Sequence, residues 1–168
     1  TDETNAFMGL WAGRHPAIVS LYRVGKSLGG VPIWQLTLTN RKTGKDSDKP
    51  AAFFEGGRHS GEITASEGSL YLAWKLITGY GTDRDITRMV DDKAIYIRPN
   101  SNPDGGDMYR STAQTNRSSI RPTDNNGNGL LDDASPTDLN GDGYVTQIRR
   151  NVGPGNGTHI VDGRGPTR

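Results

Sequence analysis

The apolar positions of this chain recur with two periods, which predict four strands and two helices. Strand-like runs, either alternating or continuously apolar, cover residues 18–25, 33–39, 51–54 and 94–97. Between the third and fourth runs, a helical repeat is formed by Ile63, Leu70, Trp74 and Ile77. Gly79 follows where this helix would end, and a shorter helix is expected over residues 83–90. Strands interleaved with helices predict an α/β fold with a mixed β-sheet flanked by helices.

The segments outside these elements carry weaker signals. Residues 1–5 predict a loose start, followed by a short packed turn or helix that contains Phe7, Leu10 and Trp11. Residues 40–50 are polar and predict a solvated hairpin or crossover loop. Residues 64–67, Thr-Ala-Ser-Glu, fit a capping box that would start the long helix. Two X-Pro steps and a glycine over residues 98–105 predict an extended, turning loop.

The end of the third strand carries the best candidate for chemistry. Gly56 and Gly57 break the strand and permit a sharp turn, and His59 and Glu62 follow three residues apart. Imidazole nitrogen and carboxylate oxygen are both zinc ligands, so the two side chains can converge on one ion where the strand passes into the helix. Spacing alone leaves an alternative open, in which a surface histidine lies beside a solvated glutamate that the helix dipole favours.

Composition narrows the class of protein. The 168 residues suffice for one domain with a core, but only 32% are hydrophobic, 23 are glycine and the mean hydropathy is −0.70, which indicates a polar, loop-rich protein. A net charge of +1 argues against general nucleic-acid binding, and no apolar run reaches membrane-spanning length. Absence of cysteine excludes disulfides, thiolate metal sites and cysteine nucleophiles without indicating the compartment. No signal peptide opens the sequence, so a secreted protein would be present here in mature form.

Residues 122–150 form an acidic stretch, rich in Asn and Gly, that predicts calcium binding. Segments starting at Asp124 and Asp138 both follow D-x-N-x-[DN]-G and resemble the calcium loops of EF-hand, dockerin and thrombospondin-type repeats. The twelfth positions, Ser135 and Arg149, supply no bidentate glutamate, so the expected affinity is modest. The alternative is an acidic turn cluster without metal. Most candidate ligands would bind calcium through side-chain oxygens, whereas the residues at the seventh position of each loop would bind through backbone carbonyls. The candidates are Asp124, Asn126, Asn128, Leu130, Asp132, Asp133, Asp138, Asn140, Asp142 and Tyr144.

One ordered set of motifs extends over most of the chain, from about residue 15 to residue 150. It consists of a strand, two glycines, His-x-x-Glu, a long helix, a strand, Asn102-Pro103-Asp104-Gly105 and then arginines. This set resembles the zinc carboxypeptidase family of metallopeptidases (M14-type). The resemblance implies a zinc-carboxypeptidase-like (phosphorylase/hydrolase-like) fold, incomplete here, with residues 1–168 as the N-terminal part of the domain. Residues 122–150 look like an insertion found in some bacterial members.

The resemblance also assigns roles to particular side chains. It implies that zinc is bound by His59 and Glu62. It further implies that Arg117, or alternatively Arg121, polarises the scissile carbonyl and stabilises the oxyanion; an ordinary surface role for both arginines is the competing interpretation. The sequence departs from the family at Gly61, where many members carry arginine.

Several parts that the family needs have no match in the sequence. They are a second ligand histidine, an Asn-Arg pair for the substrate's terminal carboxylate, a tyrosine and a general-base glutamate, and the surroundings of His159 fit none of these roles. The chain alone is therefore expected to be inactive. The full-length protein is expected to be a secreted metallocarboxypeptidase that binds Zn²⁺ and Ca²⁺ and acts on the C-termini of peptides and proteins. Its expected partners include a C-terminal fragment of the same protein or further copies. The alternative is a non-catalytic extracellular protein that keeps this fold, is stabilised by calcium and self-associates.

Overall fold

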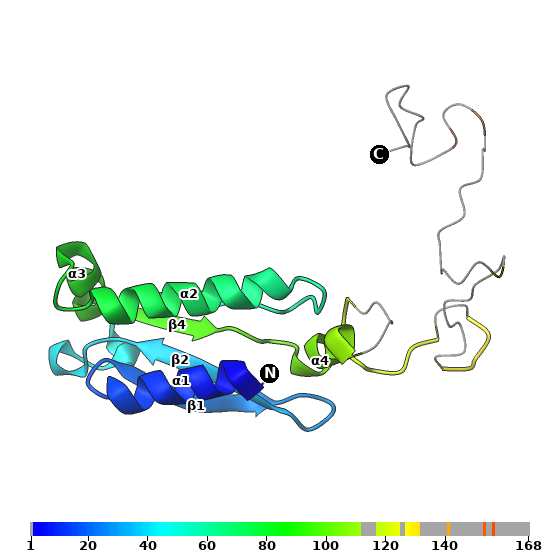
Figure 1. Cartoon of the computed structure of the whole chain (residues 1–168), viewed down its shortest axis with the longest axis horizontal. Helices are drawn as coiled ribbons and strands as arrows, with labels where there is room; N and C mark the ends of the chain where they lie inside the picture. The colour runs from blue at the N-terminus through cyan, green and yellow to red at the C-terminus, as the bar shows by residue number, and fades with distance from the viewer. Residues whose placement is uncertain are drawn as a thin grey trace. The chain divides into compact units, whose positions relative to one another are not determined.

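The computed structural model describes residues 2–111, 117–124 and 127–131, together with residues 141, 153 and 156. The chain forms two compact units, Thr1–Thr123 and Asp124–Arg168, and the helices and strands of the described residues all lie in the first (Figure 1). The elements in chain order are α1 (Asp2–Arg14), β1 (Val19–Lys26), β2 (Pro32–Leu38), the 3₁₀ helices η1 (Arg41–Thr43) and η2 (Asp46–Asp48), β3 (Ala51–Glu55), α2 (Ile63–Gly79), α3 (Arg84–Asp92), β4 (Ala94–Arg98) and α4 (Pro103–Ser111).

The strands form one mixed sheet in the order β1-β2-β4-β3. β1 pairs with β2, and β2 with β4, in antiparallel fashion. β3 and β4 run parallel, with Ala51 opposite Ala94 and Glu55 opposite Arg98. A parallel pair needs a long crossover connection, which α2 and α3 supply. The predicted α/β fold with a mixed sheet and helices is therefore confirmed.

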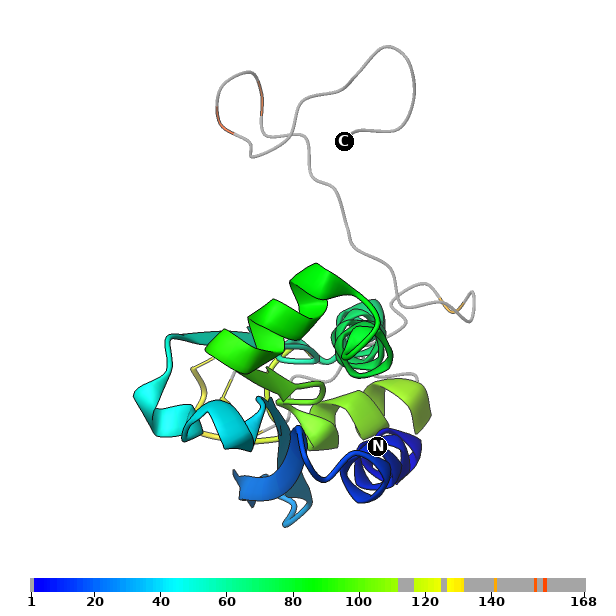
Figure 2. The same cartoon turned by 90° about the vertical axis from the view of Figure 1, so that its left-hand side faces the viewer.

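Two helices, α1 and α2, cover the same face of the sheet, as the view along the strands shows (Figure 2). The apolar sides of the strands face these helices because side chains alternate between the two faces of a strand. Each large aliphatic side chain buried there contributes about 1.5–3 kcal/mol. The buried core consists of Met8, Ile18, Val19, Leu36, Leu38, Ala73, Leu76, Ile77, Val90, Ile95 and Ile97. Among the described residues, no helix has both the length and the apolar character needed to cross a membrane.

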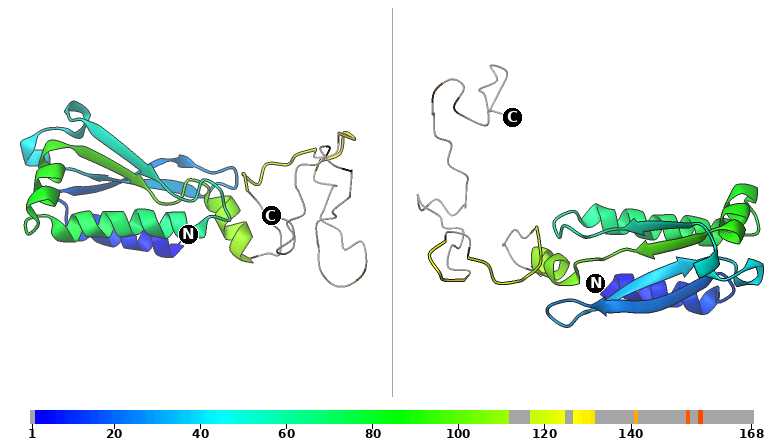
Figure 3. Two further views of the ribbon diagram at one scale, coloured as in Figure 1. Left: turned by 90° about the horizontal axis from the view of Figure 1, so that it is seen from above. Right: turned by 180° about the vertical axis from the view of Figure 1, so that it is seen from behind.

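The opposite face of the sheet is free of the long helices (Figure 3). A hollow on this face is lined mainly by polar and charged residues, among them Tyr22, Gln35, Asp46, Tyr96 and Arg98. Gln35 of β2 is buried there between the Tyr22 hydroxyl, which accepts from its side-chain amide, and Arg98, which donates to its carbonyl oxygen at 2.9 Å. Tyr96 donates its hydroxyl to Asp46 at 3.1 Å. Burial and the nearby Asp46 carboxylate raise the pKa of Tyr96, so this hydroxyl remains a donor through the neutral range.

Two predicted features of helix starts are wrong. α1 begins at Asp2, so residues 2–5 are helical rather than loose; Asp2 and Glu3 lie where the helix dipole favours acidic side chains. α2 begins at Ile63, ahead of the predicted capping box, and Glu62 at its cap position makes no side-chain cap bond. The reason is that Glu62 N–H donates to His59 O and Ala65 N–H to Glu62 O, so the turn runs directly into the helix.

The segment after β4 also differs from its prediction. The sequence predicts an extended loop through residue 105, but α4 begins at Pro103. Proline is tolerated at the first helical position because the N–H it lacks would have no partner inside the helix. The side-chain oxygen of Asn102 accepts from Gly105 N–H at 3.1 Å and caps this helix. Residues 99–102 alone remain irregular.

Replacing Ile97 by alanine should lower the free energy of unfolding by about 2–5 kcal/mol, because this side chain is fully buried between the sheet and α2. Urea denaturation of the variant and the unmodified protein measures the difference. Leu28→Ala is the matched control, since this leucine is largely exposed and should change stability by less than about 0.5 kcal/mol. Equal losses in the two variants would contradict the assigned core.

Candidate metal and substrate site

The parallel pairing of β3 with β4 brings two candidate loops to one edge of the sheet. Because the strands run in the same direction, the residues after Glu55 and after Arg98 leave the sheet side by side. Backbone hydrogen bonds continue past the strand ends, from Gly56 N–H to Arg98 O at 2.8 Å, from Ser101 N–H to Gly56 O at 3.0 Å and from Asn102 N–H to Gly57 O at 3.1 Å. The two loops therefore hold each other in place.

Glycine is required at positions 56 and 57 by close packing. A Cβ atom on Gly56 would lie 2.4 Å from the carbonyl oxygen of Ala65 and 2.8 Å from that of Pro99. Gly57 has a φ of 60°, and a Cβ atom there would lie 2.8 Å from Ser66 Oγ. The loop consequently passes between the first turn of α2 and the residues that follow β4.

His59 and Glu62 meet in this loop. Nδ1 of His59 lies 3.0 Å from Oε1 of Glu62, at hydrogen-bond distance, and their side chains are 36% and 55% exposed. Both atoms are donors that zinc prefers, and they are reachable from solvent, so the pair fits one side of a zinc site. A catalytic zinc takes three protein ligands. Within the described residues, no group of three or more His, Asp and Glu side chains that could hold a metal occurs.

The structure separates the two candidate arginines. Nη1 of Arg117 lies 3.5 Å from Oε1 of Glu62, so its guanidinium is on the same side of the loop as the His59–Glu62 pair. The side-chain amide of Asn102 donates to Ser118 O at 2.7 Å, which ties residue 118 to the loop after β4. Within the described residues, Glu62 contacts His59 and Arg117 but not Arg121.

Glu55, the last residue of β3, helps to hold the two loops of the site together, a role that the sequence does not indicate. One carboxylate oxygen accepts from the guanidinium of Arg58, and the other accepts from Ser101 Oγ at 3.2 Å. Glu55 therefore holds the residue before His59 and the residue before Asn102 at the same time. Its position directly before the glycines is the only signal in the sequence, and that signal does not reveal the partners.

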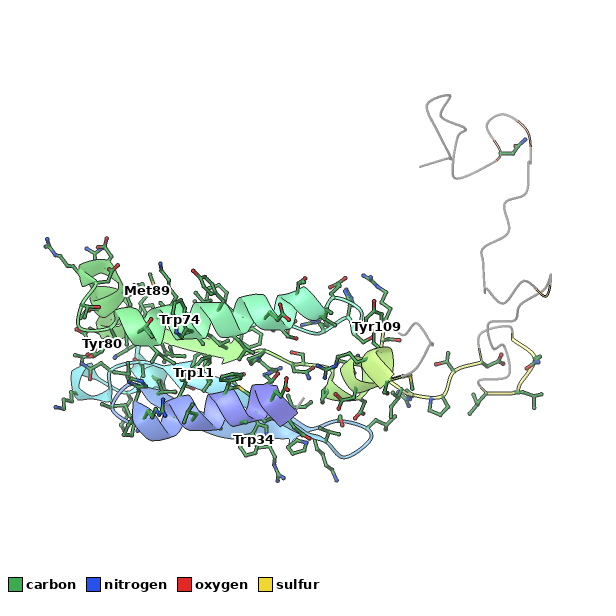
Figure 4. All side chains as sticks on the ribbon, viewed as in Figure 1. Trp11, Trp34, Trp74, Tyr80, Met89 and Tyr109 are labelled. Carbon is green, nitrogen blue, oxygen red and sulfur yellow. The ribbon has the colours of Figure 1, made fainter. Side chains whose placement is uncertain are left out.

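Gly61, the position that departs from the family pattern, is exposed and has an aromatic ring beside it. A Cβ atom there would lie 3.2 Å from the ring of Tyr109, which projects from α4 (Figure 4). With a side chain at position 61, this ring would have to shift by a few tenths of an ångström. The sequence offers no signal for this contact between Tyr109 and position 61.

A surface groove of about 410 Å³ has His59 in its lining. Its walls come from the turn between β1 and β2, the loops after β3 and β4, and residues 117–119, and its lining includes Leu28, Arg58, His59, Asn102 and Arg117. A separate hollow of about 510 Å³ lies on the helix-free face of the sheet. It contains neither His59 nor Glu62, so the smaller groove is the one associated with the candidate chemistry.

Only part of the predicted calcium stretch belongs to the described residues. The carboxylate of Asp124 accepts from the backbone N–H groups of Gly127 at 2.6 Å, Asn128 at 3.2 Å and Gly129 at 2.8 Å. Of the other candidate ligands, Asn128 and Leu130 are described as well, and Asn128 accepts from Leu130 N–H at 2.8 Å. The candidates outside the described residues are Asn126, Asp132, Asp133, Asp138, Asn140, Asp142 and Tyr144, as is His159.

Comparison with known proteins agrees with the motif order. Residues 4–155 match the family described as zinc carboxypeptidase (peptidase M14). The chain is 32% identical to carboxypeptidase A1 of Rattus norvegicus over 116 residues, which cover 69% of this chain and 26% of that protein. It is 35% identical to a zinc carboxypeptidase of Saccharothrix mutabilis subsp. capreolus over 91 residues, which cover 54% of this chain and 21% of that protein. The matched residues therefore span about a quarter of the length of these two relatives.

Solved structures show the same relationship at the level of the fold. Carboxypeptidase A from Helicoverpa armigera superposes with a TM-score of 0.63 at 24% identity, over 72% of this chain and 28% of that one. A metallo-carboxypeptidase from Burkholderia cenocepacia superposes with a TM-score of 0.50 at 27% identity, over 60% of this chain and 26% of that one. The four-stranded sheet is thus part of a carboxypeptidase A-like fold. Since the family match spans most of its length, the chain belongs to the zinc carboxypeptidase family.

Proposed function

We propose that the full-length protein is a zinc-dependent metallocarboxypeptidase that removes C-terminal residues from peptides and proteins. The observation that carries this proposal is the meeting of His59, Glu62 and Arg117 beside one groove, at the edge where β3 and β4 end. Membership of the family supports it. Two zinc donors come from the described residues, and the third ligand and the general base are proposed to lie outside them.

In this proposal, His59 Nδ1 and Glu62 hold the metal from one side. Zinc bound there would act as a Lewis acid and lower the pKa of its bound water to about 7. Both donors must be deprotonated to bind a metal, so any proton shared between Nδ1 of His59 and Oε1 of Glu62 has to leave. Zinc binding at this pair should therefore release protons.

Arg117 is proposed to stabilise negative charge that develops on the carbonyl oxygen of the cleaved peptide bond. Its guanidinium is permanently charged and offers several N–H donors in one plane. The contact with Glu62 keeps it beside the metal donors, but the arginine side chain is 74% exposed, so little energy is needed to turn it towards a substrate. Arg121 is the alternative for this role.

A second proposal concerns calcium and, with it, an extracellular location. The stretch from residue 124 to residue 142 contains five aspartates and no basic residue, so its carboxylates repel one another in the absence of cations. The Asp124 carboxylate draws three backbone N–H groups around itself. Without a glutamate at the twelfth positions, the affinity should resemble the 10⁻⁴–10⁻³ M range of extracellular calcium modules.

Replacing His59 by alanine should abolish stoichiometric zinc in the full-length protein, because the metal loses one of its proposed ligands. Elemental analysis after dialysis against zinc-free buffer measures this. The matched control is His15→Ala, which removes a histidine outside the groove and should leave the zinc content unchanged. Full zinc content in the His59 variant would refute the assignment.

Replacing Arg117 by alanine should lower kcat of the full-length protein by about 10²–10³-fold, with a smaller change in KM, because the donor acts on charge that develops during the reaction. Steady-state hydrolysis of a peptide substrate gives both constants. The Arg121→Ala variant should keep a kcat close to that of the unmodified enzyme. The reverse order of the two variants would transfer the role to Arg121.

Removal of calcium should lower the melting temperature and open residues 127–143 to proteases first. Binding to the folded state alone contributes about 2.7 kcal/mol at a hundredfold excess of ligand over Kd. The measurement uses EGTA at fixed free zinc, so that zinc loss does not contribute, and Asp142→Ala should reproduce part of the effect. An unchanged melting temperature and an unchanged first cleavage site would show that this stretch is an ordinary acidic turn cluster.

A further inference from the structure

We propose that the turn between β1 and β2, residues 27–31, forms one wall of the substrate groove, and that its Leu28 selects apolar side chains upstream of the cleaved bond. The proposal rests on the carboxypeptidase function proposed above and adds a specificity element to it. Three observations carry it: a buried carboxylate fixes the turn, the turn lines the same groove as His59, and its leucine is exposed there.

The turn is fixed in place by Asp104. This residue belongs to the first turn of α4 and is only 9% exposed. Oδ1 of Asp104 accepts from Ser27 Oγ at 2.7 Å, and Oδ2 accepts from Gly29 N–H at 2.8 Å. Both carboxylate oxygens are thus used to hold the turn, and charge-assisted bonds of this kind are stronger than neutral ones.

The shape of the turn matches this anchor. Ser27 Oγ also accepts from Val31 N–H at 2.9 Å, so one hydroxyl links the two ends of the turn to the carboxylate. A Cβ atom on Gly29 would lie 2.8 Å from Oδ1 of Asp104, which requires glycine at this position. The tip is consequently a rigid element fastened to α4, and α4 starts directly after the loop that packs against the His59 loop.

The groove offers two chemically different walls. Leu28 comes from the turn and Ile33 from the start of β2, whereas Arg58 and Arg117 come from the loops after β3 and α4. The guanidinium of Arg58 is already paired with Glu55, and that of Arg117 lies near Glu62. The groove is therefore lined by apolar side chains as well as by two cations whose charge is partly compensated.

The reaction indicates which part of the substrate lies in the groove. A carboxypeptidase substrate has a single residue after the cleaved bond, while the chain before that bond continues into solvent. A groove that is open and has walls from several segments suits the continuing part, whose residues need contacts along its length. Leu28 is therefore assigned to the residues that precede the cleaved bond.

A single exposed leucine is common on protein surfaces and by itself signals nothing. Leu28 is 64% exposed, so its substitution leaves the core untouched, and its effect on substrate choice can be measured separately from its effect on folding. Placing a negative and then a positive charge at this position should change the preference between charged peptides in opposite directions, which substitution of a merely structural residue would not do.

The test uses the full-length, zinc-loaded protein and peptides that share their preferred C-terminal residue but carry Leu, Lys or Glu at the positions just upstream. Leu28→Glu should raise kcat/KM for the Lys peptides relative to the Glu peptides by about two- to fivefold, and Leu28→Lys should shift this ratio in the opposite direction by a similar factor. Both variants should cleave the Leu peptides less well than the unmodified protein. The shifts should shrink in high salt because exposed charges are screened.

The matched controls are Tyr71→Glu and Tyr71→Lys on the outer side of α2. Tyr71 is 60% exposed, close to the value for Leu28, but it lies outside the groove, so these variants should keep the unmodified ratio. If cleavage occurs and the Leu28 ratios equal the unmodified ratio, or if the Tyr71 variants shift it equally, the assignment of this wall is wrong. If the unmodified protein releases no C-terminal residue from any peptide, the proposed function fails, and this assignment fails with it.

A second variant examines the anchor. Ser27→Ala, combined with Leu28→Glu, removes the hydroxyl that joins the turn to Asp104 and leaves the charge of the groove unchanged. The Lys-to-Glu ratio should then move back towards the unmodified value while zinc content stays constant. Zinc content is the necessary readout here because Ser27 and Asp104 contact each other rather than the metal donors. An undiminished ratio in the double variant would show that the bond between Ser27 and Asp104 does not position Leu28.

Discussion

The candidate site depends on one constraint, the parallel pairing of β3 with β4 and its continuation beyond the strand ends. The bonds among Gly56, Gly57 and residues 98–102 make two loops that are distant in sequence into one rigid edge. Without this pairing, His59 and Asn102 would have no fixed relation. The glycines are part of the same constraint, since a side chain at position 56 would collide with the backbone of α2 and of residue 99.

Polar side chains then attach further segments to this edge. Glu55 joins the residues that precede His59 and Asn102, the Asn102 amide holds residue 118, and Asp104 holds the turn between β1 and β2. Each uses a hydrogen bond to a loop rather than burial of apolar surface. A protein with only 32% hydrophobic residues can organise its loops in this way, because charge-assisted hydrogen bonds specify geometry that a small core cannot.

Sequence periodicity predicted the four strands and the two helices between β3 and β4, and the two glycines at positions 56 and 57 predicted the turn before His59 and Glu62. It failed where a helix start depends on contacts made elsewhere: α1 is held by core packing of Met8, and α4 begins at a proline that also reads as a loop signal. Pairings such as that of Asp104 with Ser27 join residues 77 positions apart. No local pattern encodes them, and the same holds for the ring of Tyr109 beside Gly61.

Among the described residues, β3 has a neighbouring strand on one side only. Its Phe53 and Phe54, on opposite faces, are 50% and 43% exposed, although parallel strands are usually covered on both faces. An edge of this kind is a template for pairing with any extended chain. A protein limited to these residues is therefore expected to aggregate through β3 as its concentration rises. A charged residue in place of Phe53 would keep it dispersed without altering the buried core, at the cost of the contact between that ring and the Arg98 guanidinium 5.0 Å away.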